Sequence, residues 1–354
     1  MDWNRRLAGL RDRLAAEDAA ALLVSSQANV RYLTGFAGEG LLVLTPTGAL
    51  LSTDGRYKVE AAEMATGVEA CFHEAGHLAG AYEYLGAIAV TSTGFEAEAL
   101  TYGSYLTLQE KLDGIELRPA RRWVEDLRVH KEEAEVEAMG GAAAMVDQAL
   151  ARFLDGLEPG KTERELALDL TRELAAAGTD PPFPIIMASG ESSARPHAVP
   201  GTRRLAEGDM LKIDVGGQHE GYCSDMTRTF FIGEPNDKFR EVYGLVLAAQ
   251  AQALSVVGPD VPAREVDQAA RDIITVGGYG EAFSHGLGHG VGLQVHEGPR
   301  VSAKSEDVLK PGMVVTIEPG IYLEGWGGVR IEDLVLITPD GAEVLTHAPK
   351  PRYE

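Results

Sequence analysis

The chain has 354 residues, of which 45% are hydrophobic and 24% are charged, so it suits two folded domains and is too apolar to be disordered. Its formal charge of −22 argues against binding to nucleic acid or to an anionic membrane surface, both of which need a basic face. The two cysteines, Cys71 and Cys223, lack CxxC spacing, and we recognise neither a signal peptide nor an apolar run near the roughly 18 residues of a membrane span. We therefore expect a cytoplasmic, reduced protein.

The first part of the chain has a mixed αβ pattern. Trp3, Leu7, Leu10 and Leu14 are spaced as in an amphipathic helix, and the apolar run 20–24 follows. The runs 41–44 and 49–51 flank Thr-Pro-Thr-Gly, which predicts a strand, a turn and a strand. Two helical stretches, near 58–65 and 102–112, complete the pattern.

We place a domain boundary after residue 126. The charged segment 128–133 follows and opens a long helix. The sequence therefore predicts an N-terminal domain over residues 1–126 and a larger domain over residues 127–354.

The larger domain contains an internal duplication. The segment 162–166, Thr-Glu-Arg-Glu-Leu, is followed one hundred positions later by Pro-Ala-Arg-Glu-Val at 262–266. Thr162 and Glu165 form a capping-box pattern, and Pro262 suits the first position of a helix. Each copy precedes an apolar run that holds one carboxylate, and a second carboxylate follows further along the chain. This shared order favours duplication over chance similarity.

The first pair of carboxylates is Asp214 and Asp225. The segments around them are strand-like, and 216–221 between them is turn material. If the strands pair about that turn, we expect the two aspartates to face each other on one side of the sheet. Two ionised aspartates in that position need a shared proton or a cation.

The second pair, Glu318 and Glu332, repeats this arrangement around the turn-rich stretch 322–328. Any one of these acids could be a hydrogen-bonded residue at a strand end. Four acids in apolar runs, paired twice in the same way, are better explained by two divalent cations that share carboxylate ligands.

Histidines supply the remaining candidates. His285, His289 and His296 fall within twelve residues, and the first two lie in a run with a glycine at almost every second position, which lets backbone approach closely. His197 lies in the corresponding region of the first copy. A site of oxygens and one imidazole favours Mn, Co, Fe or Zn over Ca or Mg.

These segments resemble the creatinase/prolidase family of metallopeptidases, whose catalytic domain has the pita-bread fold. The resemblance lies in FPIIMASGESSARPHA (183–198), IDVGGQHEGYCSDMTRTF (213–230), HGLGHGVGLQVHEGPR (285–300), TIEPGIY (316–322) and GVRIED (328–333), with NVRYLTGFAGEG (29–40) resembling the family's N-terminal domain. It implies an α+β fold in which a pita-bread domain with a pseudo-two-fold repeat follows a smaller, creatinase-type αβ domain.

The resemblance also implies site residues. The metal ligands would be Asp214, Asp225, His289, Glu318 and Glu332, with Asp225 and Glu332 bridging two ions, Mn in the first place and Co or Zn as alternatives. Glu318 would be the general base, His197 and His296 would bind substrate or stabilise the tetrahedral intermediate, and His285 would line the site. Arg330 would hold a bridging carboxylate, and Thr227 would be either a supporting hydroxyl or an ordinary strand residue.

The implied reaction is hydrolysis of an Xaa-Pro bond in small peptides. Arg300 matches an arginine that in prolidases contacts the dipeptide carboxylate, which favours an Xaa-Pro dipeptidase. An Xaa-Pro aminopeptidase acting on longer peptides is the nearest alternative, and a non-catalytic, protein-binding pita-bread domain is a distant one. Methionine aminopeptidase usually lacks the N-terminal domain, and creatine amidinohydrolase lacks the metal site. The family resemblance further leads us to expect a homodimer.

Overall fold

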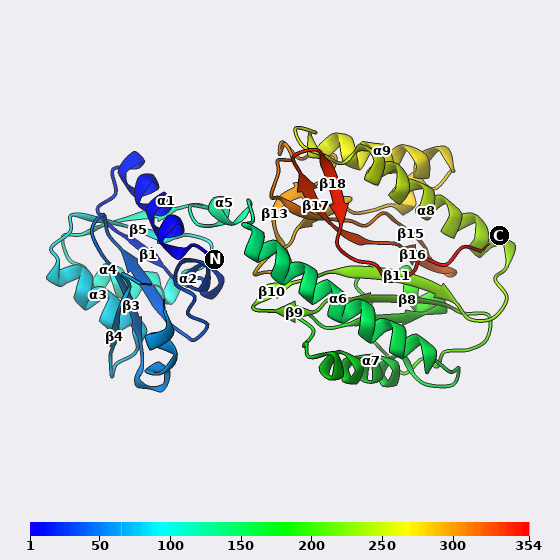
Figure 1. The fold of residues 1–354 in the computed structure, drawn as a ribbon, viewed down its shortest axis with the longest axis horizontal. Coiled ribbons are helices and arrows are strands. Elements are labelled where there is room, and N and C mark those ends of the chain that lie inside the picture. The colour runs from blue at the N-terminus through cyan, green and yellow to red at the C-terminus, as the bar shows by residue number, and fades with distance from the viewer. Residues whose placement is uncertain (65, 354) are drawn as a thin grey trace. The chain divides into compact units, whose positions relative to one another are not determined.

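The computed structural model describes residues 1–64 and 66–353. The chain divides into two compact units, Met1–Arg128 and Val129–Glu354. Figure 1 shows the elements of each unit along the chain. No helix in the described part of the chain combines the length and the apolar composition of a membrane span.

Unit 1 is built on a six-stranded sheet of order β4-β3-β2-β1-β5-β6. The strands are β1 (Leu22–Val24), β2 (Leu41–Leu44), β3 (Ala49–Thr53), β4 (Glu69–Phe72), β5 (Ser92–Glu96) and β6 (Glu116–Ala120). The helices are α1 (Trp3–Ala16), α2 (Gln27–Thr34), α3 (His77–Ala87), α4 (Tyr102–Lys111) and α5 (Glu125–Arg128), and two 3-10 turns are η1 (Gly55–Tyr57) and η2 (Glu60–Glu63).

The local patterns of unit 1 are largely confirmed. Helix α1 buries Leu7, Leu10 and Leu14, and β2 pairs antiparallel with β3 across the expected turn. The helix expected near 58–65 is wrong: the described part of that stretch holds only η2, and residue 65 lies outside the described residues. Ala61 is the only residue of η2 that is buried, so this stretch has no apolar stripe with which a longer helix could pack.

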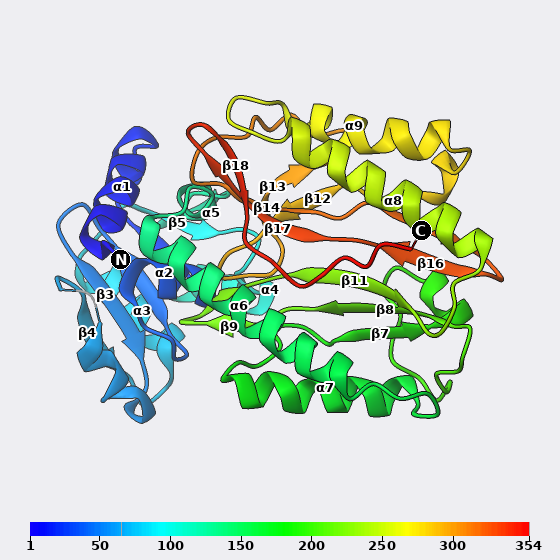
Figure 2. The ribbon, with the colours of Figure 1, turned by 45° about the vertical axis from the view of Figure 1, so that its right-hand side comes forward.

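Unit 2 contains two helix pairs and two main sheets. The helices are α6 (Glu133–Asp155), α7 (Glu163–Ala177), α8 (Asp237–Val256) and α9 (Ala263–Val276), with 3-10 turns η3 (Gly190–Ala194) and η4 (Gly280–Ala282). The sheets are β11-β8-β7 and β13-β12-β14-β17-β18, with two-stranded ladders β10-β9 and β15-β16. Figure 2 shows α8 and α9 on one side of these strands and α6 and α7 on the other.

The strands of the first half are β7 (Ile186–Ser189), β8 (Met210–Val215), β9 (Gln218–His219), β10 (Tyr222–Cys223) and β11 (Met226–Phe231). Those of the second half are β12 (Gly288–Gly290), β13 (Glu297–Val301), β14 (Val314–Ile317), β15 (Gly320–Leu323), β16 (Gly327–Arg330), β17 (Asp333–Thr338) and β18 (Gly341–Val344).

The two halves repeat one plan, as the duplication predicted. Helices α7 and α9 begin one hundred residues apart, and each is preceded by an isolated bridge, Thr162 with Arg204 and Pro262 with Val308. The capping box of Thr162 and Glu165 is present. Pro262 is the N-cap of α9, so it precedes the first helical position that we expected it to occupy.

The first hairpin has a different register from the expected one. Asp214 pairs with Thr227, not with Asp225. The cause is a two-residue turn at Glu220 and Gly221, both with positive φ, which closes β9 against β10 and fixes the register of the outer strands. Asp225 is displaced by two residues from the position opposite Asp214, and a shift of two keeps it on the same side.

The second hairpin keeps Glu318 and Glu332 at matching positions. Ile317 pairs with Asp333 on one side of them and Gly320 pairs with Arg330 on the other. The stretch 322–328, expected to be turn-rich, holds a turn at 324–326, and its two ends belong to the paired strands β15 and β16.

Candidate metal centre

Three ligand-type side chains meet where the two hairpins approach each other. Asp225, His289 and Glu332 each offer one ligand atom, and these atoms lie within 4.8 Å of one another. His289 Nε2 is 3.7 Å from Asp225 Oδ2 and 3.4 Å from Glu318 Oε1. The structure therefore brings together four of the five expected ligands: His289 and the three acids Asp225, Glu318 and Glu332.

Asp214 joins the same cluster from β8 through Arg330. The Arg330 guanidinium forms an ion pair with Asp214 Oδ2, and Arg330 Nε is 3.9 Å from Glu318 Oε2. Arg330 and both acids are largely removed from water, because the exposed fraction of each side chain is 14% or less.

The charges of these acids are poorly compensated. Burial, followed by the negative charge of neighbouring acids, raises the pKa of Asp225 and of Glu332 well above their usual values. Burial also raises the pKa of Glu318 to about 7, although Arg330 opposes the rise. Asp225 Oδ1 and Asp214 Oδ1 are buried without a hydrogen-bond partner among the described residues. Such a cluster of buried, unpartnered oxygens fits divalent cations.

The tautomer of His289 suits a ligand role. Its Nδ1 lies 3.0 Å from the carbonyl oxygen of Gly290, which can only accept, so Nδ1 carries the proton and Nε2 offers its lone pair. Burial lowers the pKa of His289, which keeps the ring neutral. His289 is therefore prepared to bind a cation through the nitrogen that faces the acids.

The glycines around His289 allow backbone to approach closely. A Cβ atom at Gly288 would lie 1.9 Å from the carbonyl oxygen of Thr316, and one at Gly290 would lie 1.9 Å from that of Gly298. Any larger residue at either position would push β12 away from its neighbours. The glycine-rich pattern is thus explained by close packing of the backbone beside His289.

Two threonines hold the carboxylates of the second half. Thr227 Oγ1 donates to Glu332 Oε2 at 2.6 Å and accepts from Arg330 Nε at 2.8 Å. Thr316 Oγ1 donates to Glu318 Oε1 and accepts from the backbone N–H of His289, both at 3.1 Å. Arg330, which we expected to hold a bridging carboxylate, pairs with Asp214 and is linked to Glu332 through the Thr227 hydroxyl between them.

His285 belongs to a hydrogen-bonded chain with Tyr322 and Arg330. Its Nδ1 donates to the carbonyl oxygen of Gly286 at 2.7 Å, so its Nε2 carries no proton. This Nε2 accepts from the Tyr322 hydroxyl at 3.0 Å, and the same hydroxyl accepts from Arg330 at 3.0 Å. Burial lowers the pKa of His285 to about 4 and raises that of Tyr322 to about 12, so both are neutral at pH 7.

The other expected site residues lie around this centre. The His296 ring packs against that of His289 with centroids 4.4 Å apart. Arg300 pairs with His289 across β12 and β13, so both side chains lie on one face of the sheet, and Arg300 is exposed. His197 is exposed and close enough for its charge to influence the pKa of Glu318.

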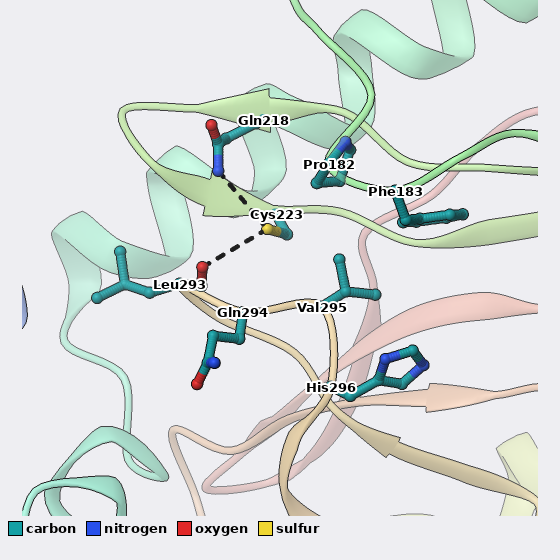
Figure 3. Close-up of a pocket in the computed structure, with 8 residues that line it drawn as sticks. All are labelled: Pro182, Phe183, Gln218, Cys223, Leu293, Gln294, Val295 and His296. Atoms are coloured by element: carbon teal, nitrogen blue, oxygen red, sulfur yellow. Dashed lines mark hydrogen bonds between the residues drawn. The ribbon is translucent and has the colours of Figure 1, made fainter. Parts of the chain in front are cut away.

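A cavity of about 470 Å³ opens beside His296. Figure 3 shows Phe183 and Val295 beside it, and Cys223 bonded to the backbone oxygen of Leu293. Pro182, Gln218 and Gln294 complete its lining. His296 thus lines this cavity and also packs against His289.

Tyr322, Thr316 and Lys212 were not singled out in the sequence. Tyr322 and Thr316 lie at the two ends of the segment TIEPGIY, where only the glutamate drew attention. Lys212 gave a clearer signal, because a lysine between Leu211 and Ile213 in an apolar strand needs polar partners.

Two family models match the chain. The model of metallopeptidase family M24 matches residues 137–339, and that of the creatinase/prolidase N-terminal domain matches residues 6–130. The chain belongs to metallopeptidase family M24. The fold is accordingly the two-domain creatinase/prolidase architecture with a pita-bread domain, as the sequence predicted.

Named relatives match over nearly the full length. An Xaa-Pro dipeptidase of Pyrococcus horikoshii is 39% identical over 92% of each chain. The structure of an Xaa-Pro dipeptidase from Bacillus anthracis has a TM-score of 0.95, with 37% identity over 99% of each chain. That of an X-Pro aminopeptidase from Thermotoga maritima has a TM-score of 0.88, with 33% identity over 94% of this chain and 97% of the other.

Proposed function

We propose that this protein is a metal-dependent Xaa-Pro dipeptidase, which hydrolyses the peptide bond before proline in dipeptides. The observation that carries the proposal is the buried cluster of acids around His289 Nε2, in a chain of family M24. Its similarity to proteins named Xaa-Pro dipeptidase supports the choice of substrate.

We assign five ligands, Asp214, Asp225, His289, Glu318 and Glu332, to two divalent cations. The support is the charge of the cluster: four carboxylates need more positive charge than Arg330 alone provides. A donor set of carboxylate oxygens and one imidazole suits Mn, Co, Fe or Zn. The family resemblance leads us to put Mn first, with Co or Zn as alternatives.

Bound divalent cations would lower the pKa of a coordinated water and withdraw charge from the scissile carbonyl. Glu318 would accept the proton of the attacking water and return it to the leaving proline nitrogen. Glu318 Oε1 lies 3.4 Å from His289 Nε2, so this carboxylate is placed to carry a proton at the proposed centre.

We assign substrate binding to His197, His285, His296 and Arg300. A ring N–H of His197 or His296 would donate to the carbonyl oxygen as negative charge develops on it. His285, held by Tyr322, would line the site. The cavity beside His296 offers space for the side chain of the residue before proline.

Arg300 is our reason for preferring dipeptides. It shares a sheet face with His289, and its exposed guanidinium can bind a carboxylate with two parallel hydrogen bonds. A dipeptide carries its carboxylate on the proline itself, next to the scissile bond, whereas a longer peptide does not.

An Xaa-Pro aminopeptidase is the second candidate, favoured by the likeness to the Thermotoga maritima structure. Hydrolysis of Ala-Pro and Ala-Pro-Ala by the Mn-loaded protein separates the two. We expect the dipeptide to have the higher kcat/KM. Efficient cleavage of the tripeptide alone would favour the aminopeptidase, and cleavage of neither would refute both.

We also propose that the protein acts as a homodimer in the cytoplasm. The support is the resemblance to its family and the low cysteine content of two. Light scattering during size-exclusion chromatography tests the dimer, for which we expect twice the mass of one chain.

A further inference from the structure

We propose that Lys212 is a positioning residue that fixes the backbone leading to His197, an inference that rests on the role proposed for His197. Lys212 lies on β8 two residues before Asp214, so both side chains project from the same face of the strand. Its side chain is fully buried.

The Lys212 amino group binds backbone carbonyls of one short segment. Nζ donates to the oxygens of Arg195 at 2.7 Å and Ser193 at 2.9 Å, and the oxygen of Pro196 lies 3.4 Å away. Carbonyl oxygens only accept, so Nζ is the donor in each contact. His197 is the next residue of the chain.

The hydrogen bonds of Lys212 Nζ all go to this segment. Within residues 1–64 and 66–353 no carboxylate forms a salt bridge with it, and Nζ lies 4.9 Å from the centroid of the Tyr322 ring. An apolar side chain would fill the same space without the penalty of burying an amino group. We therefore take the carbonyls of Ser193, Arg195 and Pro196 as the partners that explain a lysine at this position.

Other contacts hold the same segment without replacing Lys212. Glu163 accepts from the N–H groups of Ser189 and Gly201, which fixes the two ends. Arg330 donates to Pro196 O at 3.3 Å. The Ser193 hydroxyl also accepts from the N–H of Gly328. The carbonyls of Ser193 and Arg195 accept hydrogen bonds from Lys212, so its removal loosens the residues just before His197.

The test compares the wild type with Lys212→Met, which keeps the length of the side chain and removes its donors. Lys304→Met, at an exposed lysine, is the matched control. Hydrogen exchange measured by mass spectrometry needs no substrate. We expect faster exchange over 190–201 in Lys212→Met and unchanged exchange in Lys304→Met.

Activity tells whether the effect acts through His197. We expect Lys212→Met to lower kcat/KM for Ala-Pro by about 10- to 100-fold at unchanged metal content, as for a group misplaced by about 1 Å. In a His197→Ala background the same change should lower it by less than about twofold. Equal losses in both backgrounds, or unchanged exchange over 190–201, would overturn the inference.

Two further results keep this test decisive. If Lys212→Met does not fold, Lys212→Gln, which retains an amide donor, takes its place. We expect its exchange over 190–201 to be faster than that of the wild type and slower than that of a fully exposed segment. Exchange at the wild-type rate would count against the inference. If the wild type fails to cleave Ala-Pro, the proposed function is wrong, while the exchange data still judge the role of Lys212.

Discussion

The buried carboxyl group of Glu318 makes the stability of the metal-free protein depend on pH. Its pKa is raised from 4.5 to about 7, so the folded state keeps a proton that the unfolded state releases. Stability from this group is therefore fully present below pH 4.5 and is lost as the pH rises toward 7. Glu318→Gln, which cannot ionise, should not show this loss.

The size of the effect follows from the shift. At about 1.36 kcal/mol for each tenfold change in the acid dissociation constant, a rise in the pKa from 4.5 to about 7 corresponds to roughly 3 kcal/mol. In a unit the size of Val129–Glu354, this is roughly 6 to 12 °C in Tm. Because the lowered pKa values of His285 and His289 act in the opposite sense, the quantity to measure is the difference between the wild type and Glu318→Gln.

Thermal unfolding of both chelated proteins between pH 4.5 and 7.5 is the assay. We expect the Tm of Glu318→Gln to rise relative to the wild type across this range. Loading with Mn should raise the Tm of the wild type more than that of Glu318→Gln, because cations replace the proton as partners of Glu318 and the variant lacks this ligand. Parallel Tm curves of the two chelated proteins would refute the assignment of a buried, protonated Glu318.

Three more changes test the centre. His289→Ala should abolish Ala-Pro hydrolysis and reduce bound metal, measured by elemental analysis, with an unchanged circular dichroism spectrum; retained turnover would mean that another histidine is the ligand. Arg300→Ala should raise KM for Ala-Pro by roughly 10-fold or more and leave that for Ala-Pro-Ala nearly unchanged, and equal effects would remove the carboxylate contact. Gly288→Ala should lower stability by about 1–3 kcal/mol, whereas Gly140→Ala, in the open face of α6, should raise it by about 0.5–1 kcal/mol; a neutral Gly288→Ala would contradict the close backbone approach.

The repeat in unit 2 was predictable because it is local in sequence. The matching helix starts at 163 and 263 and the acid-bearing strands after them lie in one order, and the structure keeps that order. The register of the first hairpin was not predictable from symmetry about the loop. It depends on which two residues adopt positive φ. Glutamate rarely does so, and Glu220 therefore gave no sign of the turn in the sequence.

Residue types predicted the acids and the histidine of the centre better than the residues that hold them in place. Acids in apolar strands are anomalous in sequence, so Asp214 and Glu332 stood out. Thr316, Tyr322 and Lys212 each also bind a residue of another segment: the N–H of His289, the ring of His285 and the carbonyl of Arg195, respectively. Only the three-dimensional arrangement reveals what such residues bind.

The central claim is that two divalent cations at this centre support hydrolysis before proline. The most direct measurement follows Ala-Pro hydrolysis as Mn is titrated into the chelated protein, with bound metal quantified at each point. We predict no turnover without metal and a plateau at two ions per chain. Turnover that persists after complete removal of metal, or a metal-loaded protein that leaves Ala-Pro and Ala-Pro-Ala intact, would contradict it.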